Sequence, residues 1–87
     1  MHYVKKAKYL EGYKVVLTFE DKSEKIVDFQ KLLKDFKGEI FHPLKDIEYF
    51  KTFRVEIGTI SWPNDADYSP DALYKFGKKF AQKKKAI

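Results

Sequence analysis

Alternating hydrophobic and polar residues predict a strand over residues 13–19. One face of this strand would carry Tyr13, Val15, Leu17 and Phe19. Residues 3–10 and 24–28 contain further β-forming residues and are expected to be its neighbours. The connections are short, since Glu11-Gly12 joins the first two segments and Asp21-Lys22-Ser23 joins the last two. These short turns predict a meander of three antiparallel strands.

A helical pattern follows the third strand. Asp28 is expected to cap this helix, because its carboxylate can accept hydrogen bonds from the exposed backbone N–H groups. Its hydrophobic residues recur at helical spacing and are Phe29, Leu32, Leu33 and Phe36. Glu39 to Leu44 is expected to be an irregular connector, because Pro43 disfavours a helical backbone in the residue before it. Asp46 would then cap a short second helix. The hydrophobic residues of that helix are Ile47 and Phe50.

The remaining elements are two short strands and a third helix. Residues 53–57 alternate and predict a fourth strand, and residues 59–62 predict a fifth after the break at Gly58. Ser69 is expected to cap the third helix, with Pro70 at its first position. The hydrophobic stripe of that helix is expected to be Leu73, Phe76 and Phe80. The order β-β-β-α-α-β-β-α predicts an α+β fold, with an antiparallel sheet of about five strands and helices packed on one face.

The chain has 87 residues, which allows one domain. Its formal net charge is +5, from 18 basic and 13 acidic residues. Residues 75–87 contain six lysines and no acidic residue, which leaves a net charge of −1 for residues 1–74. We therefore expect a single, electrically balanced α+β domain over residues 1–74 and a Lys-rich C-terminal helical extension over residues 75–87.

Composition excludes several classes of protein. The chain has no cysteine, so it forms neither disulfides nor thiolate metal sites. No hydrophobic run approaches the length of a membrane span, and lysines interrupt the N-terminal segment where a signal peptide would be hydrophobic. A cytoplasmic protein that does not bind membranes is the expectation.

Candidate catalytic groups are few. There are two histidines, His2 and His42, and three serines, with no triad or other motif spacing among them. We expect no enzymatic activity and no catalytic residues. A hypothesis with less support pairs His42 with Asp46, only because the two residues are close in sequence.

A metal site is not expected either. Asp65, Asp67, Ser69 and Asp71 stand at alternate positions, as at the start of a calcium-binding loop. That loop needs glycine at its sixth position and a bidentate glutamate at its twelfth. The corresponding residues here are Pro70 and Phe76. The four glycines are isolated, so no phosphate-binding loop is present and no cofactor is expected.

The lysines near the C-terminus have two main interpretations. They form a solvated helix end, or they contact nucleic acid non-specifically. The residues that would make such contact are Lys78, Lys79, Lys83, Lys84 and Lys85. A membrane-surface role would need a broader hydrophobic face. Only one of the 18 cationic residues is arginine (Arg54), so specific recognition of base edges is not expected.

The segment from Thr59 to Tyr74 is the other candidate surface. In the structural interpretation, Trp62 closes a strand over the core, Pro63 ends that strand and a helix begins at Ser69. In the functional interpretation, a rigid loop presents three residues to a partner, since tryptophan is enriched in interface hot spots. These predicted partner-binding residues are Trp62, Asn64 and Asp67.

The same segment resembles the bacterial domain-of-unknown-function family 2442, whose members commonly end in a motif like T-I-x-W-P-N-G-A-D-L-x-P-D-x-L-Y. Further upstream, the stretches from Leu17 to Lys22 and from Phe41 to Phe50 are similar to other motifs of the family. Three positions depart from the pattern: Asp65 and Lys22 replace glycine, and Tyr68 replaces an aliphatic residue. Non-glycine residues resist positive φ, so the first two departures call the conformations of both turns into question.

The resemblance covers residues 3–74 and implies an α+β domain without implying an activity. Some members of the family resemble halves of two-gene toxin–antitoxin modules, and others are joined to a DNA-binding domain. We therefore predict a non-enzymatic protein-interaction or regulatory module, such as an antitoxin-like partner of a small co-encoded protein. The alternative is a nucleic-acid-associated accessory protein that uses its C-terminal lysines.

Overall fold

A computed structural model describes residues 2–35 and 38–79. The predicted meander is confirmed, with strands β1 (Val4–Glu11), β2 (Lys14–Phe19) and β3 (Glu24–Asp28) paired antiparallel in sequence order. A short strand β6 (Lys78–Lys79) pairs antiparallel with the free edge of β3. The sheet order is therefore β1-β2-β3-β6.

The fourth and fifth predicted strands form a separate two-stranded sheet. β4 (Arg54–Glu56) pairs antiparallel with β5 (Thr59–Ser61). The backbone N–H of Val4 donates to the carbonyl of Gly58 at 2.7 Å, which joins the turn of this hairpin to the start of β1. The α+β class and the order of elements are confirmed, and the five predicted strands are divided between two sheets.

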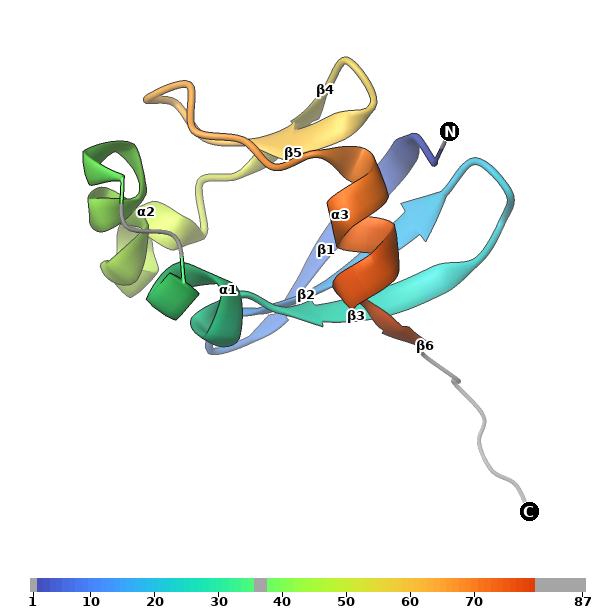
Figure 1. The fold of residues 1–87 in the computed structure, drawn as a ribbon, viewed down its shortest axis with the longest axis horizontal. Coiled ribbons are helices and arrows are strands. Elements are labelled where there is room, and N and C mark those ends of the chain that lie inside the picture. The colour runs from blue at the N-terminus through green and yellow to red at the C-terminus, as the bar shows by residue number, and fades with distance from the viewer. Residues whose placement is uncertain (1, 36–37, 80–87) are drawn as a thin grey trace.

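Within the described residues, three α-helices and one 3₁₀ helix complete the fold. They are α1 (Phe29–Asp35), the 3₁₀ helix η1 (Glu39–Lys45), α2 (Ile47–Phe50) and α3 (Pro70–Phe76). The hairpin and the segment after β5 lie across the core from the large sheet, and α3 runs from that segment to β6 (Figure 1). The helices α1 and α2 lie together with η1 at one end of the molecule (Figure 1).

Two local predictions need correction. The connector from Glu39 to Leu44 is helical, because i to i+3 hydrogen bonds close on both sides of Pro43 without needing its missing N–H. The third helix ends at Phe76, and Gly77 caps it with an extended backbone (φ −68°, ψ 147°). The chain then enters β6, so the predicted helical extension does not continue through residues 78–79. Phe80 and the rest of the extension lie outside the described residues.

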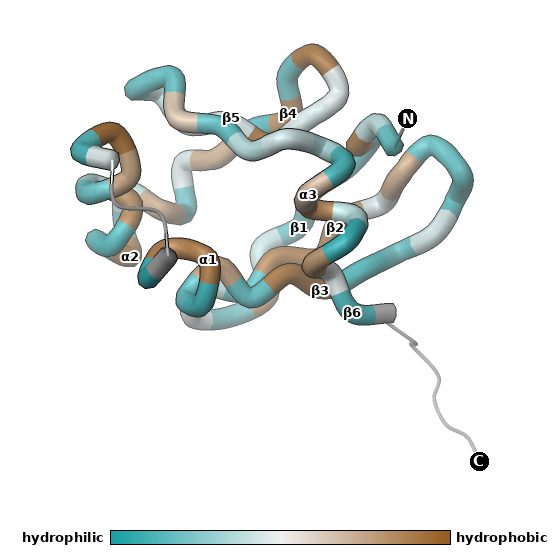
Figure 2. The backbone as a smooth tube through the Cα atoms, viewed as in Figure 1, coloured by the Kyte–Doolittle hydropathy of each residue, from teal (hydrophilic) through white to brown (hydrophobic). Residues whose placement is uncertain are grey.

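Five of the fifteen buried residues in the core cluster are aromatic, and they come from different parts of the fold. Phe29 opens α1, and its ring lies 5.5 Å from Phe50, 5.7 Å from Trp62 and 5.2 Å from Tyr68, measured between centroids. Phe19 of β2 is also completely buried. Hydrophobic residues concentrate on β2, β3 and α1, whereas the turn between β2 and β3 is hydrophilic (Figure 2). Burying large rings compensates for the small size of the domain.

Candidate functional site

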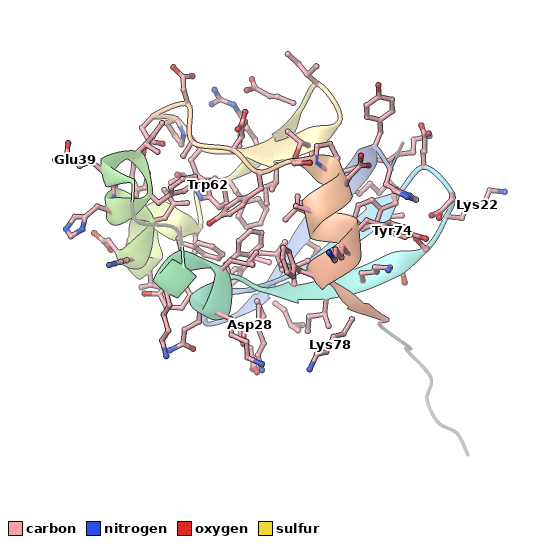
Figure 3. The ribbon with its side chains drawn as sticks, in the orientation of Figure 1. Lys22, Asp28, Glu39, Trp62, Tyr74 and Lys78 are labelled. Atoms are coloured by element: carbon pink, nitrogen blue, oxygen red, sulfur yellow. The ribbon has the colours of Figure 1, made fainter. Side chains whose placement is uncertain are left out.

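Trp62 is a core residue. Its side chain is completely buried, and its Nε1 donates a hydrogen bond of 2.8 Å to the backbone carbonyl of Phe50. Figure 3 shows its ring inside the molecule, between the β4–β5 hairpin and the helical end. This placement matches the structural interpretation of the segment, and it leaves Trp62 unable to touch a partner directly.

The five residues after Trp62 form a tightly closed turn. The backbone N–H of Trp62 donates to the carbonyl of Ala66, and the N–H of Asp65 donates to the carbonyl of Trp62, both at 2.9 Å. Asn64 ties this turn to the helical end, because its Nδ2 donates to the carbonyl of Ile40 at 2.9 Å. Its Oδ1 accepts from the N–H of Ala66 at 3.1 Å. We call residues 62–67 the clamp loop.

The clamp loop buries its hydrophobic residues Trp62 and Ala66 and exposes its carboxylates, Asp65 and Asp67. Tyr68, which follows the loop, is also buried. An isolated antiparallel bridge pairs Asp67 with Ser61, which fixes the backbone at the exposed carboxylate. Of the three predicted partner-binding residues, Trp62 is buried, Asn64 stabilises the loop through its hydrogen bonds, and Asp67 is exposed to solvent. Burial raises the pKa of the Tyr68 phenol.

A cluster around Tyr74 was not foreseen from the sequence. The Tyr74 hydroxyl donates to Asp21 Oδ2 at 2.9 Å, and its ring stacks on His2 at a centroid distance of 3.7 Å. Lys25 Nζ lies 3.7 Å from the centroid of the same ring and donates to the Tyr74 carbonyl at 2.9 Å. Asp21 and Tyr74 are 53 residues apart, so no local signal could pair them. Figure 3 shows Tyr74 on α3 on the same side of the molecule as Lys22.

Hydrogen bonds hold the Asp21 carboxyl in its charged form. The Ser23 hydroxyl donates to it at 2.5 Å and the Ser23 backbone N–H at 2.9 Å, and Tyr74 adds a third donor. These bonds lower the pKa of Asp21 from its ordinary value of 3.8 to about 2. Electrostatic attraction by His2 also lowers this pKa and is the smallest of the causes. The cluster fastens α3 and the N-terminus to the turn between β2 and β3.

The histidine considered for catalysis lies apart from these groups. His42 is exposed on η1, and the carboxylate of Asp46 accepts a hydrogen bond of 3.0 Å from the backbone N–H of Glu48 as the cap of α2. Asp46 therefore acts as the predicted N-cap. The expectation that the chain is not an enzyme stays a prediction.

Two shallow hollows are each lined in part by residues of α1. The first has a volume of about 230 Å³ and is lined by Lys14, Ile26, Asp28, Lys31 and Lys78. The second has a volume of about 250 Å³ and is lined by Tyr13, Gln30, Leu33, Lys34 and Lys45. Figure 3 shows Asp28 and Lys78 on the outer side of the large sheet, pointing away from the core.

The first hollow corrects the view of the C-terminal lysines as separate from the body. Lys78 belongs to β6 and shares the hollow with Lys14 of β2 and Lys31 of α1. The sequence could not show this, because a two-residue strand has no periodicity to detect. Lys79 pairs with Lys25 through the strand register. The other predicted nucleic-acid contacts, Lys83, Lys84 and Lys85, lie outside the described residues.

Within residues 2–35 and 38–79, no group of three or more histidine, aspartate or glutamate side chains is placed to hold a metal ion. In the same part of the chain, no helix has the length and hydrophobicity needed to cross a membrane.

A family model described as "Protein of unknown function (DUF2442)" matches residues 4–79. The matched range runs from β1 to β6 and includes the clamp loop and both hollows. No curated protein and no solved structure matches the chain.

Proposed function

The chain belongs to the DUF2442 family, and from this premise we propose that it is a non-enzymatic interaction module that binds another small protein. The partner would be encoded beside it, as an antitoxin-like role requires. The description of the family assigns no activity, so the proposal rests on the surface of this chain.

The observation that supports the proposal is the rigidity of the clamp loop. Its backbone is closed by its own hydrogen bonds and tied to η1 through Asn64. Trp62 anchors one end in the core. A loop that is already ordered loses little conformational entropy when it binds, so its exposed groups can contribute more to affinity.

The exposed groups of the loop indicate the chemistry of the partner. Asp65 and Asp67 are exposed carboxylates on a fixed backbone, next to the exposed Pro63. A partner with lysine or arginine side chains on a rigid surface would complement them. The predicted roles are therefore contact for Asp67 and loop support for Trp62 and Asn64.

The test compares two variants with the same change of charge. The first is the double variant Asp65→Asn and Asp67→Asn, and the control is Glu20→Gln with Glu24→Gln, whose side chains are also exposed. Each full-length chain is used to capture partners from its native host, and the affinity for the co-encoded protein is measured by calorimetry.

We expect the clamp-loop variant to lose about tenfold or more in affinity, because one lost charged contact in an interface costs on the order of 1.4 kcal/mol. The control should bind like the wild type. Absence of any stoichiometric protein partner, or equal losses in the two variants, would refute the proposal.

A further inference from the structure

The surface around α1 gathers five lysines from four elements, which are Lys14, Lys31, Lys34, Lys45 and Lys78. We propose that this lysine surface binds the phosphodiester backbone of nucleic acid without reading its bases. The lysine surface is separate from the clamp loop, because no residue of that loop lines either hollow.

The register of the large sheet explains how the first hollow forms. Lys14 is paired with Asp28, and Lys78 is paired with Ile26, so two lysines flank β3 from the strands on either side. Asp28 and Ile26 are two residues apart on β3 and therefore share its outer face. Lys31 completes the hollow from the first turn of α1.

The charge of this surface is largely uncompensated. Asp28 is the only acidic residue lining the two hollows, and its Oδ1 already accepts a hydrogen bond of 3.0 Å from the backbone N–H of Gln30. Lys14 lies 3.9 Å from Glu11 Oε2, an exposed pair that contributes little. Among the side chains that the structure describes, which do not include that of Asp35, no carboxylate forms an ion pair with the other four lysines.

The lining favours a phosphate backbone over an acidic protein segment. Ile26 and Leu33 are the only aliphatic residues lining the hollows, whereas protein interfaces usually bury a hydrophobic core. Lysine binds phosphate as a point charge, and a phosphodiester chain presents such charges at regular intervals.

Base recognition is not expected at this surface. The single arginine, Arg54, lies on β4 and pairs with Glu56 at 3.0 Å. The single tryptophan is buried in the core and cannot stack on a base. Binding should therefore be independent of sequence and should depend strongly on salt.

The experiment measures binding of full-length chains to a fluorescent, mixed-sequence duplex DNA by anisotropy at several salt concentrations. The test variant replaces Lys14, Lys31 and Lys78 with glutamine. The matched control replaces Lys5, Lys22 and Lys51, which are exposed and line neither hollow. A third variant replaces Lys83, Lys84 and Lys85, and circular dichroism verifies that all variants are folded.

We expect the test variant to bind at least about tenfold more weakly than the control at low salt. Its slope of log affinity against log salt should also fall by about 2.7, since each lost phosphate contact removes about 0.9. A loss confined to the Lys83, Lys84 and Lys85 variant would overturn the proposal, as would equal losses in the test variant and the control. Tighter binding to polyglutamate than to DNA would also overturn it and would indicate an acidic protein partner.

Discussion

At the scale of single residues, the clearest feature is the backbone at Lys22 and Asp65. Both adopt positive φ, 73° and 70°, at positions where the resembled motifs have glycine. The turns therefore keep a glycine-like conformation even though glycine has been replaced. A lysine in this region pays a steric cost, whereas aspartate tolerates it better.

We predict that Lys22→Gly stabilises the protein by about 0.5 to 1 kcal/mol. Glycine removes the steric strain of a left-handed backbone at this position. This gain in stability exceeds the loss that comes from the greater conformational entropy of glycine in the unfolded chain. Asp65→Gly should change the stability little, because aspartate starts with less strain. Urea unfolding of both variants measures the difference, and a loss of stability in Lys22→Gly would show that this turn does not adopt positive φ.

Asp21 gives a prediction about pH. The pKa of its carboxyl is lowered in the folded protein to about 2, from 3.8, so its bonds to Ser23 and Tyr74 add stability above pH 3.8. This contribution is lost as the pH falls from 3.8 through about 2. Asp21→Asn should therefore be less stable than the wild type at neutral pH, and the gap should close in that acidic window. A gap in melting temperature that stays constant down to pH 2 would contradict this explanation.

At the scale of elements, local patterns in the sequence were enough to predict most of the strands and helices. The alternation in residues 13–19 and the capping residues Asp46 and Ser69 predict elements that the structure contains. The separation of β4 and β5 from the large sheet was not predictable, because strand patterns do not specify which strands pair across the core. The hollows were missed for a similar reason, since Lys14 and Lys78 are brought together only by pairing with β3.

The clamp loop is the element whose support can be measured most simply. Trp62→Phe removes the only donor to the Phe50 carbonyl that the structure shows within its described residues, and it leaves unfilled space in the core. We expect a destabilisation of about 2 to 4 kcal/mol. Phe76→Leu is the control, because Phe76 is 52% exposed and should change stability by no more than about 0.5 kcal/mol.

Under conditions where Trp62→Phe is still folded, partner binding should be close to that of the wild type. A buried anchor acts on binding only through the shape of the loop, which phenylalanine partly preserves. If this variant stayed fully stable yet lost its partner, Trp62 would be a contact residue and its assignment to the core would be wrong.

At the scale of the whole molecule, the two candidate surfaces have opposite charge and lie on different sides. The clamp loop exposes Asp65 and Asp67, whereas the lysine surface is formed by residues of β2, α1, η1 and β6. The segment between β5 and α3, which contains the clamp loop, lies across the core from β3 and β6 (Figure 1). Residues 75–87 account for the net charge of +5, and one of them, Lys78, shares a hollow with the body residues Lys14 and Lys31. Such an arrangement allows two different partners to bind without competing.

The burial of Trp62 anchors the clamp loop, and it can be observed directly because Trp62 is the only tryptophan in the chain. Its intrinsic fluorescence should peak at a shorter wavelength than that of the unfolded chain, and iodide should quench it poorly. Neither property should change when a partner binds the clamp loop. Emission like that of the unfolded chain, with free access for iodide before denaturant is added, would place the ring at the surface and contradict the account.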